Sequence, residues 1–339
     1  MFKKIEASAF APLNSICLLI LAGTALTWIL VYAKTILMPF TIALFLAMVL
    51  NTIARWSRKQ WKVPYWIGIL LGIMIFLGAA ALSIIFVSNS ITSFVEGMNN
   101  YTDKLNASLA WLMEMAQKAD IQINDQFVNE SLSRLPLFNM MRSMGGWVVS
   151  FISNTTLVSL FLIFLFMGRT TEHEKPTLTD IIEKQISYYL IVKLLVSLLA
   201  GLCTWIILKI TGTEMAGMFA VLTLVLNFIP NIGPFIATLL PIPVLFLQHG
   251  FDWHIVTAIF LLTTAHFIIG NILETKWLGK GMDLNLLIVI ASLIFWALVW
   301  GAMGALLAVP LTSIIKMILE RSELTKPFAE LLAGRLSFK

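Results

Sequence analysis

Residues 227–234 have the sequence Asn227-Phe228-Ile229-Pro230-Asn231-Ile232-Gly233-Pro234, a helix-breaking polar stretch inside apolar surroundings. Its two prolines lack a backbone N–H, while its glycine and its two asparagines favour turns over helix. In a bilayer, such a broken backbone is tolerated only where it is buried in protein or lines a water-filled cavity. We therefore take Asn227, Pro230, Asn231, Gly233 and Pro234 as the first candidate site residues.

The rest of the chain has the composition of an all-α, polytopic membrane protein. Of its 339 residues, 59% are hydrophobic and 12% are charged, and the mean hydropathy is +0.90. A spanning helix needs roughly 20 apolar residues, and the alternation typical of an outer-membrane barrel is absent. We predict about eight spans, at residues 13–33, 35–54, 65–88, 146–168, 188–208, 253–273, 284–300 and 302–319.

Basic residues set the expected topology, because cytoplasmic loops carry an excess of lysine and arginine. They flank the predicted spans as Lys3, Lys4, Arg55, Arg58, Lys59, Lys62, Lys276, Lys280, Arg321, Lys326, Arg335 and Lys339. We therefore expect both termini in the cytoplasm. Residues 1–88 form a three-helix membrane part, residues 89–145 an extracytoplasmic segment, and residues 146–339 a second membrane part. Trp296 and Trp300 fit the aromatic belt at the outer interface.

The extracytoplasmic segment is predicted to be a helical arm. Apolar residues recur at spacings of three and four from Ile91 to Ala116, which is typical of an amphipathic helix that continues out of the membrane. Its apolar stripe needs a partner. A shorter helix within residues 121–135 would supply one by folding back, and a contact between subunits is the alternative.

The segment 214–249 starts and ends on the same predicted face, so it makes either two crossings or none. Each arm beside the broken stretch holds roughly 12 to 14 residues, or some 18 to 21 Å of helix. The hydrocarbon core is about 30 Å thick. We predict a re-entrant helical hairpin that enters from the outer face, with residues 227–234 at its tip.

Four further polar residues fall within a predicted span or directly after its end and are candidates for a solute or ion pathway. Lys193 either extends its amine to the cytoplasmic face or binds an anion. Glu274, near Asn271 at the inner end of a span, is either an interfacial residue paired with Lys276, Lys280 or water, or a proton- or cation-responsive group. His266 lies eight residues before Glu274 and either relays protons or bonds a neighbouring helix.

Several functions are disfavoured by the absence of their motifs. The sequence has no G-x-x-x-x-G-K-[ST] loop, no H-E-x-x-H and no G-x-S-x-G. The net charge of +5 is scattered between apolar spans rather than gathered into a nucleic-acid-binding patch. We expect no enzyme, no cofactor, no metal site and no nucleic-acid partner.

Three motifs in this order resemble the autoinducer-2 exporter family of bacterial multi-pass membrane proteins. They are the stretch 227–234, then Gly270-Asn271-Ile272-Leu273-Glu274 with Gly279, and then Leu307-Ala308-Val309-Pro310-Leu311. The resemblance covers nearly the whole chain. One departure is Thr275, which stands where the family usually has proline.

The resemblance implies a transporter of small polar solutes in the lipid bilayer of the bacterial inner membrane. Export of the autoinducer-2 furanone is the function assigned to some members, and antiport of sodium or protons is proposed for others. The resemblance also implies a homo-oligomer, in which a second subunit would give the apolar stripe of the arm a partner. A scaffold that transports nothing is the alternative from another class.

Overall fold

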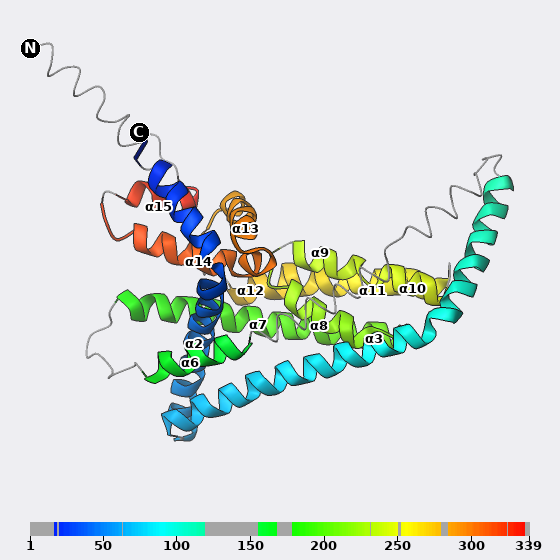
Figure 1. Cartoon of the computed structure of the whole chain (residues 1–339), viewed down its shortest axis with the longest axis horizontal. Helices are drawn as coiled ribbons and strands as arrows, with labels where there is room; N and C mark the ends of the chain where they lie inside the picture. The colour runs from blue at the N-terminus through cyan, green and yellow to red at the C-terminus, as the bar shows by residue number, and fades with distance from the viewer. Residues whose placement is uncertain are drawn as a thin grey trace, which may run out of the picture. The chain divides into compact units, whose positions relative to one another are not determined.

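The computed structural model describes residues 17–18, 20–62, 64–118, 155–167, 178–230, 232–249, 252–278, 284–323 and 325–335. Within these ranges the chain forms helices and turns without a strand (Figure 1). The expected all-α fold is therefore confirmed.

The chain divides into two compact units. Unit 1 comprises Met1–Leu46, Leu157–Thr170 and Leu284–Lys339, and unit 2 comprises Ala47–Thr156 and Thr171–Asp283. Helix α2 (Lys34–Trp61) contributes to both. Unit 1 contains most of α6 (Thr155–Met167) and all of α13 (Leu286–Trp300), α14 (Ala302–Leu319) and α15 (Lys326–Ala333). Unit 2 contains α3 (Tyr65–Lys118), α7 (Leu178–Ile210), α8 (Ala216–Leu226), α9 (Ile232–Leu239), α10 (Ile242–His249), α11 (Trp253–Phe267), the π-helix η1 (Ile268–Glu274) and α12 (Thr275–Leu278).

Five helices in the described part of the chain are long and apolar enough to cross a membrane. They are Lys34–Trp61, Tyr65–Ser90, Thr179–Ile210, Trp253–Leu278 and Ala302–Leu319, and each contains a predicted span. The other three predicted spans correspond to the shorter apolar helices Ile20–Tyr32, Thr155–Met167 and Leu286–Trp300. Residues 146–154, the first part of the predicted fourth span, lie outside the described residues. The chain is thus a polytopic α-helical membrane protein.

Helix α3 continues without a break from its apolar part, Tyr65–Ser90, to Lys118. This confirms that a helix extends from the span into the predicted arm. The expected returning helix within residues 121–135 lies outside the described residues, so the partner of the apolar stripe stays a prediction.

The predicted break is present but shorter than residues 227–234, because Gly233 and Pro234 lie in the first turn of α9. Helix α8 ends at Leu226 and α9 begins at Ile232, and a second break at Leu240 and Pro241 separates α9 from α10. Helices α8 and α10 pack with α3, α7 and α11 around one core in unit 2. The buried members of that core are Val87, Leu208, Met215, Ala216, Met218, Phe219, Leu222, Val244, Leu245, Ile255, Ala258 and Leu262. Insertion of this hairpin into the bilayer from one face stays a prediction.

The expectation that Trp296 and Trp300 form an outer aromatic belt is wrong. Both rings are buried within the protein, with 5% and 7% of their surfaces exposed. The indole N–H of Trp296 donates to Thr312 Oγ1 at 3.3 Å, and that of Trp300 donates to the Leu30 carbonyl at 3.0 Å. These tryptophans therefore satisfy their N–H groups inside unit 1 rather than at a lipid headgroup.

Helix α11 begins at an acidic cap. Asp252 accepts a hydrogen bond from the Trp253 backbone N–H at 2.6 Å and another from His254 Nδ1 at 2.7 Å. The bond from His254 lowers the pKa of Asp252 below its usual value, and the bond from the Trp253 N–H adds to this effect. The carboxylate at a helix N-terminus fixes where the membrane helix starts.

Candidate functional site

One side of α7 carries a row of buried polar side chains. Ser187, Lys193, Ser197, Thr204 and Thr211 are each no more than 2% exposed. At 3.6 residues per turn, they lie within about a third of the helix circumference. From Ser187 to Thr211 the helix rises roughly 36 Å, which exceeds the hydrocarbon thickness of about 30 Å. We call these five residues the α7 polar row.

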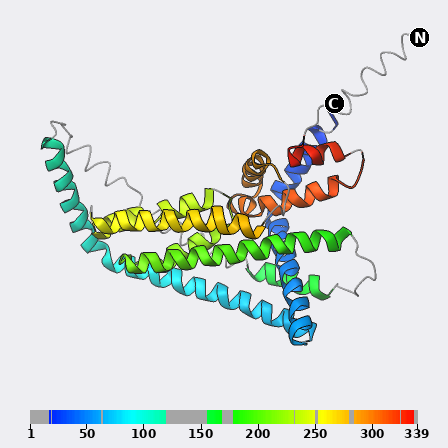
Figure 2. The ribbon, with the colours of Figure 1, turned by 180° about the vertical axis from the view of Figure 1, so that it is seen from behind.

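Lys193 pairs with Glu274 in the middle of unit 2. Its Nζ lies 2.5 Å from Glu274 Oε1, and the two side chains are 1% and 17% exposed. The expectation that Lys193 extends to the membrane surface is therefore wrong, because its buried amine ends on the partly buried carboxylate of Glu274. The partner of Glu274 is this lysine on α7, which lies next to α11 and η1 (Figure 2).

Glu274 is the last residue of the π-helix η1. A π-helix is rare, and single turns of it occur frequently at functional sites. The wider turn ends at Thr275, whose backbone N–H donates to the Ile272 carbonyl. A proline at this position would lack that N–H and could not make this hydrogen bond. Asn271 lies on an exposed side of η1, and the structure does not bring it to the α7 polar row.

At the tip of the predicted hairpin, Asn227 contacts the same row. Its Nδ2 donates to Ser197 Oγ at 3.0 Å, and both side chains are buried. Asn231 lies outside the described residues, so its role at the tip stays a prediction.

The described backbone N–H groups at the tip are bonded to carbonyls of the tip itself and of the last turn of α8. The N–H groups of Asn227, Phe228, Ile229, Ile232 and Gly233 all donate to carbonyls between Thr223 and Pro230. Pro230 and Pro234 have none. These N–H groups are therefore already bonded, and side chains and carbonyls are the groups of the tip that remain for recognition.

His266 links three helices through a directed chain of hydrogen bonds. The Thr238 hydroxyl donates to the Pro234 carbonyl at 2.9 Å, so it accepts from His266 Nδ1 at 2.8 Å. The neutral ring then accepts at Nε2 from the Thr204 hydroxyl, 3.1 Å away. His266 thus bonds α7 and α9 from α11, whereas Glu274 has a different partner.

Two glycines allow the backbones around this site to approach closely. A Cβ at Gly233 would lie 1.9 Å from the Leu226 carbonyl oxygen, which places the start of α9 against the end of α8. A Cβ at Gly201 would lie 2.9 Å from the Ala220 carbonyl oxygen, where α7 meets α8. Gly233 is therefore needed for its size, and the turn at the tip depends on it.

Thr223 adds a polar atom that the fold leaves unused. It lies one turn before Asn227 on α8 and is 1% exposed, yet its Oγ1 has no hydrogen-bond partner among the described residues. A buried hydroxyl without a partner is costly, and such a group is suited to bind a water molecule or a solute.

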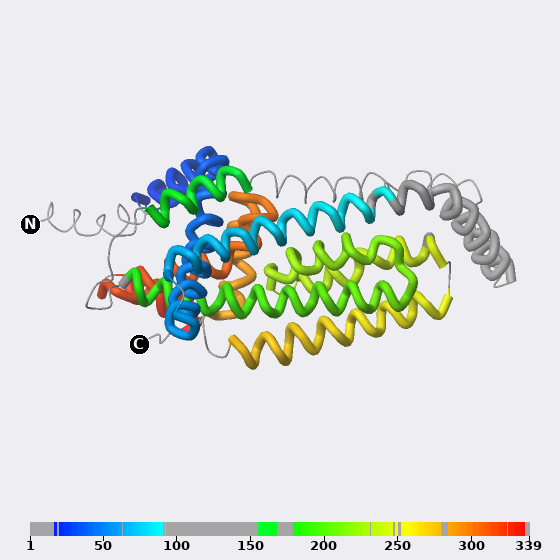
Figure 3. The backbone as a smooth tube through the Cα atoms, turned by 90° about the horizontal axis from the view of Figure 1, so that it is seen from below, coloured from blue at the N-terminus to red at the C-terminus, as the bar shows by residue number. Residues whose placement is uncertain are grey.

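The sequence alone gave no pairing for Ser197, Thr204, Thr223 or Thr238. The signal was present for the first two, since Ser197, Thr204 and Thr211 repeat at a spacing of seven in an otherwise apolar span. The partner of Ser197 is Asn227 at the end of α8 and that of Thr204 is His266 on α11, and only the packing in Figure 3 brings these helices to α7. Within the described residues, no three His, Cys, Asp or Glu side chains gather as metal ligands would.

Spanning helices, a helix broken in apolar surroundings and a buried polar row define a polytopic membrane transport protein. The family model described as AI-2E family transporter matches residues 16–323, and the chain belongs to that family.

Named relatives share most of their length with it. The AI-2 transport protein TqsA of Escherichia coli (strain K12) is 29% identical, over 89% of this chain and 90% of its own. A putative transport protein of Haemophilus influenzae is 27% identical over 95% of both chains. The putative transport protein YhhT of Escherichia coli (strain K12) is 28% identical over 86% of both.

Replacing Gly233 by alanine tests the close approach at the tip. The added methyl group collides with the Leu226 carbonyl, and we expect a loss of about 1–3 kcal/mol in unfolding free energy. Thermal unfolding of the purified protein in detergent measures it. The control is Gly78→Ala, because a Cβ at Gly78 meets nothing within 4 Å. It should leave stability unchanged or raise it by up to about 1 kcal/mol. Equal melting temperatures for Gly233→Ala and the wild type would contradict this packing.

Neutralising Glu274 tests the buried ion pair. Glu274→Gln leaves the Lys193 amine buried without its anion, at an expected cost of about 3–5 kcal/mol. Adding Lys193→Met removes the stranded charge, so the double variant should recover at least half of that loss. Glu323→Gln serves as the control, because its pair with Lys326 is exposed and 3.7 Å long. A double variant less stable than Glu274→Gln would show that Lys193 does not depend on this carboxylate.

Proposed function

We propose that this protein moves a small polar solute across the bacterial inner membrane along the α7 polar row. The observation that carries the proposal is the row itself, which is long enough to cross the hydrocarbon. Lys193, Ser197 and Thr204 each meet a polar side chain from η1, α8 or α11. Polar residues inside a membrane are costly and mark solute or ion pathways.

The chemistry of the row favours an oxygen-rich solute without net charge. Four of its five residues carry hydroxyl groups, its partner Asn227 adds an amide, and the charge of Lys193 is neutralised by Glu274. The unpartnered hydroxyl of Thr223 and the amide of Asn227 offer a donor and an acceptor to such a solute. The autoinducer-2 furanone belongs to this chemical class, and the relative TqsA is named as an AI-2 transport protein. We propose it as the first solute to test.

Transport in this proposal is facilitated or driven by a gradient, without enzymatic chemistry. Since the sequence has no phosphate-binding loop, the chain itself has no motif for ATP. Both termini would lie in the cytoplasm, and the hairpin 214–249 would enter from the outer face. Homo-oligomers held by the extracytoplasmic segment 89–145 complete the proposed arrangement.

Antiport of sodium or protons is the second candidate, and the Lys193–Glu274 pair favours it. A buried carboxylate paired with an amine can exchange its partner for a cation, and protonation changes the charge within the pathway. A scaffold without transport is the remaining alternative.

Purified protein in liposomes separates these functions. Uptake of autoinducer-2 and of sodium is measured with and without an imposed pH gradient. We expect saturable autoinducer-2 flux, which Asn227→Ala and Thr238→Val each lower at least about tenfold through the loss of one well-placed buried hydrogen bond. Ser83→Ala is the control, because the Ser83 hydroxyl bonds only the Ala79 carbonyl of its own helix.

The outcome also decides between the candidates. Sodium flux that depends on the pH gradient and disappears in Glu274→Gln would favour antiport over solute export. Autoinducer-2 flux that survives Glu274→Gln would show that the carboxylate is not needed for coupling. Movement of neither solute by the wild type would support the scaffold and refute the proposed route.

A further inference from the structure

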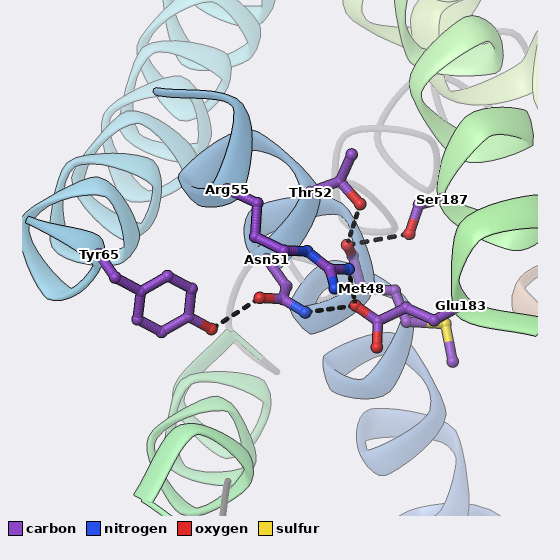
Figure 4. A network of polar contacts seen from close by, with 7 residues as sticks. All are labelled: Met48, Asn51, Thr52, Arg55, Tyr65, Glu183 and Ser187. Atoms are coloured by element: carbon purple, nitrogen blue, oxygen red, sulfur yellow. Dashed lines mark hydrogen bonds and ion pairs between the residues drawn. The ribbon is translucent and has the colours of Figure 1, made fainter. Parts of the chain in front are cut away.

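A second polar network lies where α7 begins, outside the site described above (Figure 4). Its centre is Glu183, whose side chain is 11% exposed. Asn51 Nδ2 donates to Glu183 Oε1, and the Arg55 guanidinium donates to the same oxygen at 2.7 Å. The Tyr65 hydroxyl donates to Asn51 Oδ1 at 2.7 Å. These bonds tie α2, α3 and α7 together.

The network extends the α7 polar row to its end. Glu183 and Ser187 are four residues apart and lie on the side of α7 that carries Ser197 and Thr204. The Ser187 hydroxyl donates to the Met48 carbonyl on α2 at 2.9 Å. Both polar groups at this end of the row are therefore bonded to α2, and α2 closes the row here.

Arg55 lies at the boundary between this buried network and an open hollow. Its side chain is 47% exposed, in contrast to that of Glu183. The hollow has a volume of about 820 Å³ and is lined by Thr52, Arg55, Asp180, Ile181, Lys184, Gln185, Tyr188 and Ile191. A solute in this hollow would meet the Arg55 guanidinium before it reaches Glu183.

The arrangement of bonds on Glu183 makes the ion pair separable. Asn51 and Arg55 share one carboxylate oxygen, so the carboxylate keeps the Asn51 bond when Arg55 leaves. An ion pair between a buried carboxylate and a half-exposed arginine is a weak source of stability, whereas polar pairs are suited to switching between states. A guanidinium also bonds readily to acceptor oxygens of a solute.

We propose that Arg55 and Glu183 form the gate at this end of the α7 polar row, and that the hollow is the binding place for an oxygen-rich solute that opens it. Acceptor oxygens of the solute take the guanidinium from Glu183, α2 separates from α7, and Ser187 and Lys193 become accessible. This gate rests on the proposed transport route.

Cysteine labelling tests the gate without knowledge of the solute. Ser197→Cys places a thiol inside the row, in a background with Cys17→Ser and Cys203→Ser. A membrane-impermeant maleimide is added from either face of sealed vesicles. We expect Arg55→Gln to raise the labelling rate roughly tenfold from the face where α7 begins, as the loss of a hydrogen bond to a charged group predicts. Autoinducer-2 flux should lose its selectivity in the same variant.

Charge reversal and a matched control make this result specific. Arg55→Glu with Glu183→Arg restores an opposite pair, so its labelling rate should return toward that of the wild type. Lys326→Gln removes a cation of similar exposure, 49%, from a pair remote in sequence, and it should label like the wild type. If Arg55→Gln is poorly folded, Arg55→Lys keeps the charge without the planar fork and should give an intermediate rate.

The outcomes distinguish the gate from the route. Equal labelling in the wild type and Arg55→Gln, with normal flux, would overturn the gate and leave the route intact. Fast labelling in the charge-reversed variant would also overturn it, because the pair would then not be what closes the row. A thiol at position 197 that no variant exposes to either face would contradict the route itself.

Discussion

A polar group inside a membrane protein must find its partner within the protein, because hydrocarbon supplies none. Unit 2 is organised by this constraint. Helix α7 carries serine, threonine and lysine side chains through the length of an apolar span, and α2, α8, η1 and α11 each supply a partner for one of them. The broken tip meets the same demand through its own turn, since the N–H groups of Asn227 and Gly233 bond carbonyls within one turn of each.

The same constraint explains why the two charges in the middle of the row occur together. A lysine that is 1% exposed is tolerated because Glu274 lies 2.5 Å away, and removing one partner costs far more than removing both. The π-helix contributes by setting where Glu274 lies relative to α7. The two charges of this pair cancel, and in the proposed route a proton, a cation or a solute that disturbs the pair would shift the balance between conformations.

Membership of the AI-2E transporter family agrees with this architecture, and the family supplies the class of function rather than the solute. The residues of the row and their partners narrow the choice of solute. Hydroxyls, one amide and one neutralised ion pair suit an uncharged oxygen-rich molecule better than a phosphorylated one. Arg55 and Glu183 add a second polar centre at the end of the row. Along α7, Glu183, Lys193 and Ser197 thus have polar partners from three separate parts of the chain, and the proposed route would pass all three.

Much of the fold follows from the sequence, since hydropathy sets the spans and the break between Leu226 and Ile232 contains Pro230, whose backbone limits are local. The candidate residues could also be found from the sequence, because Lys193, His266, Glu274 and Asn227 are polar where the chain is apolar. The partners of these residues could not be found in this way. Lys193 meets Glu274 across 81 residues of sequence, and Arg55 meets Glu183 across 128. Such pairs depend on which helices pack together, and the buried Trp296 and Trp300 show the same limit. Local sequence determined where polar groups enter the membrane region, and tertiary packing decided which of them satisfy one another.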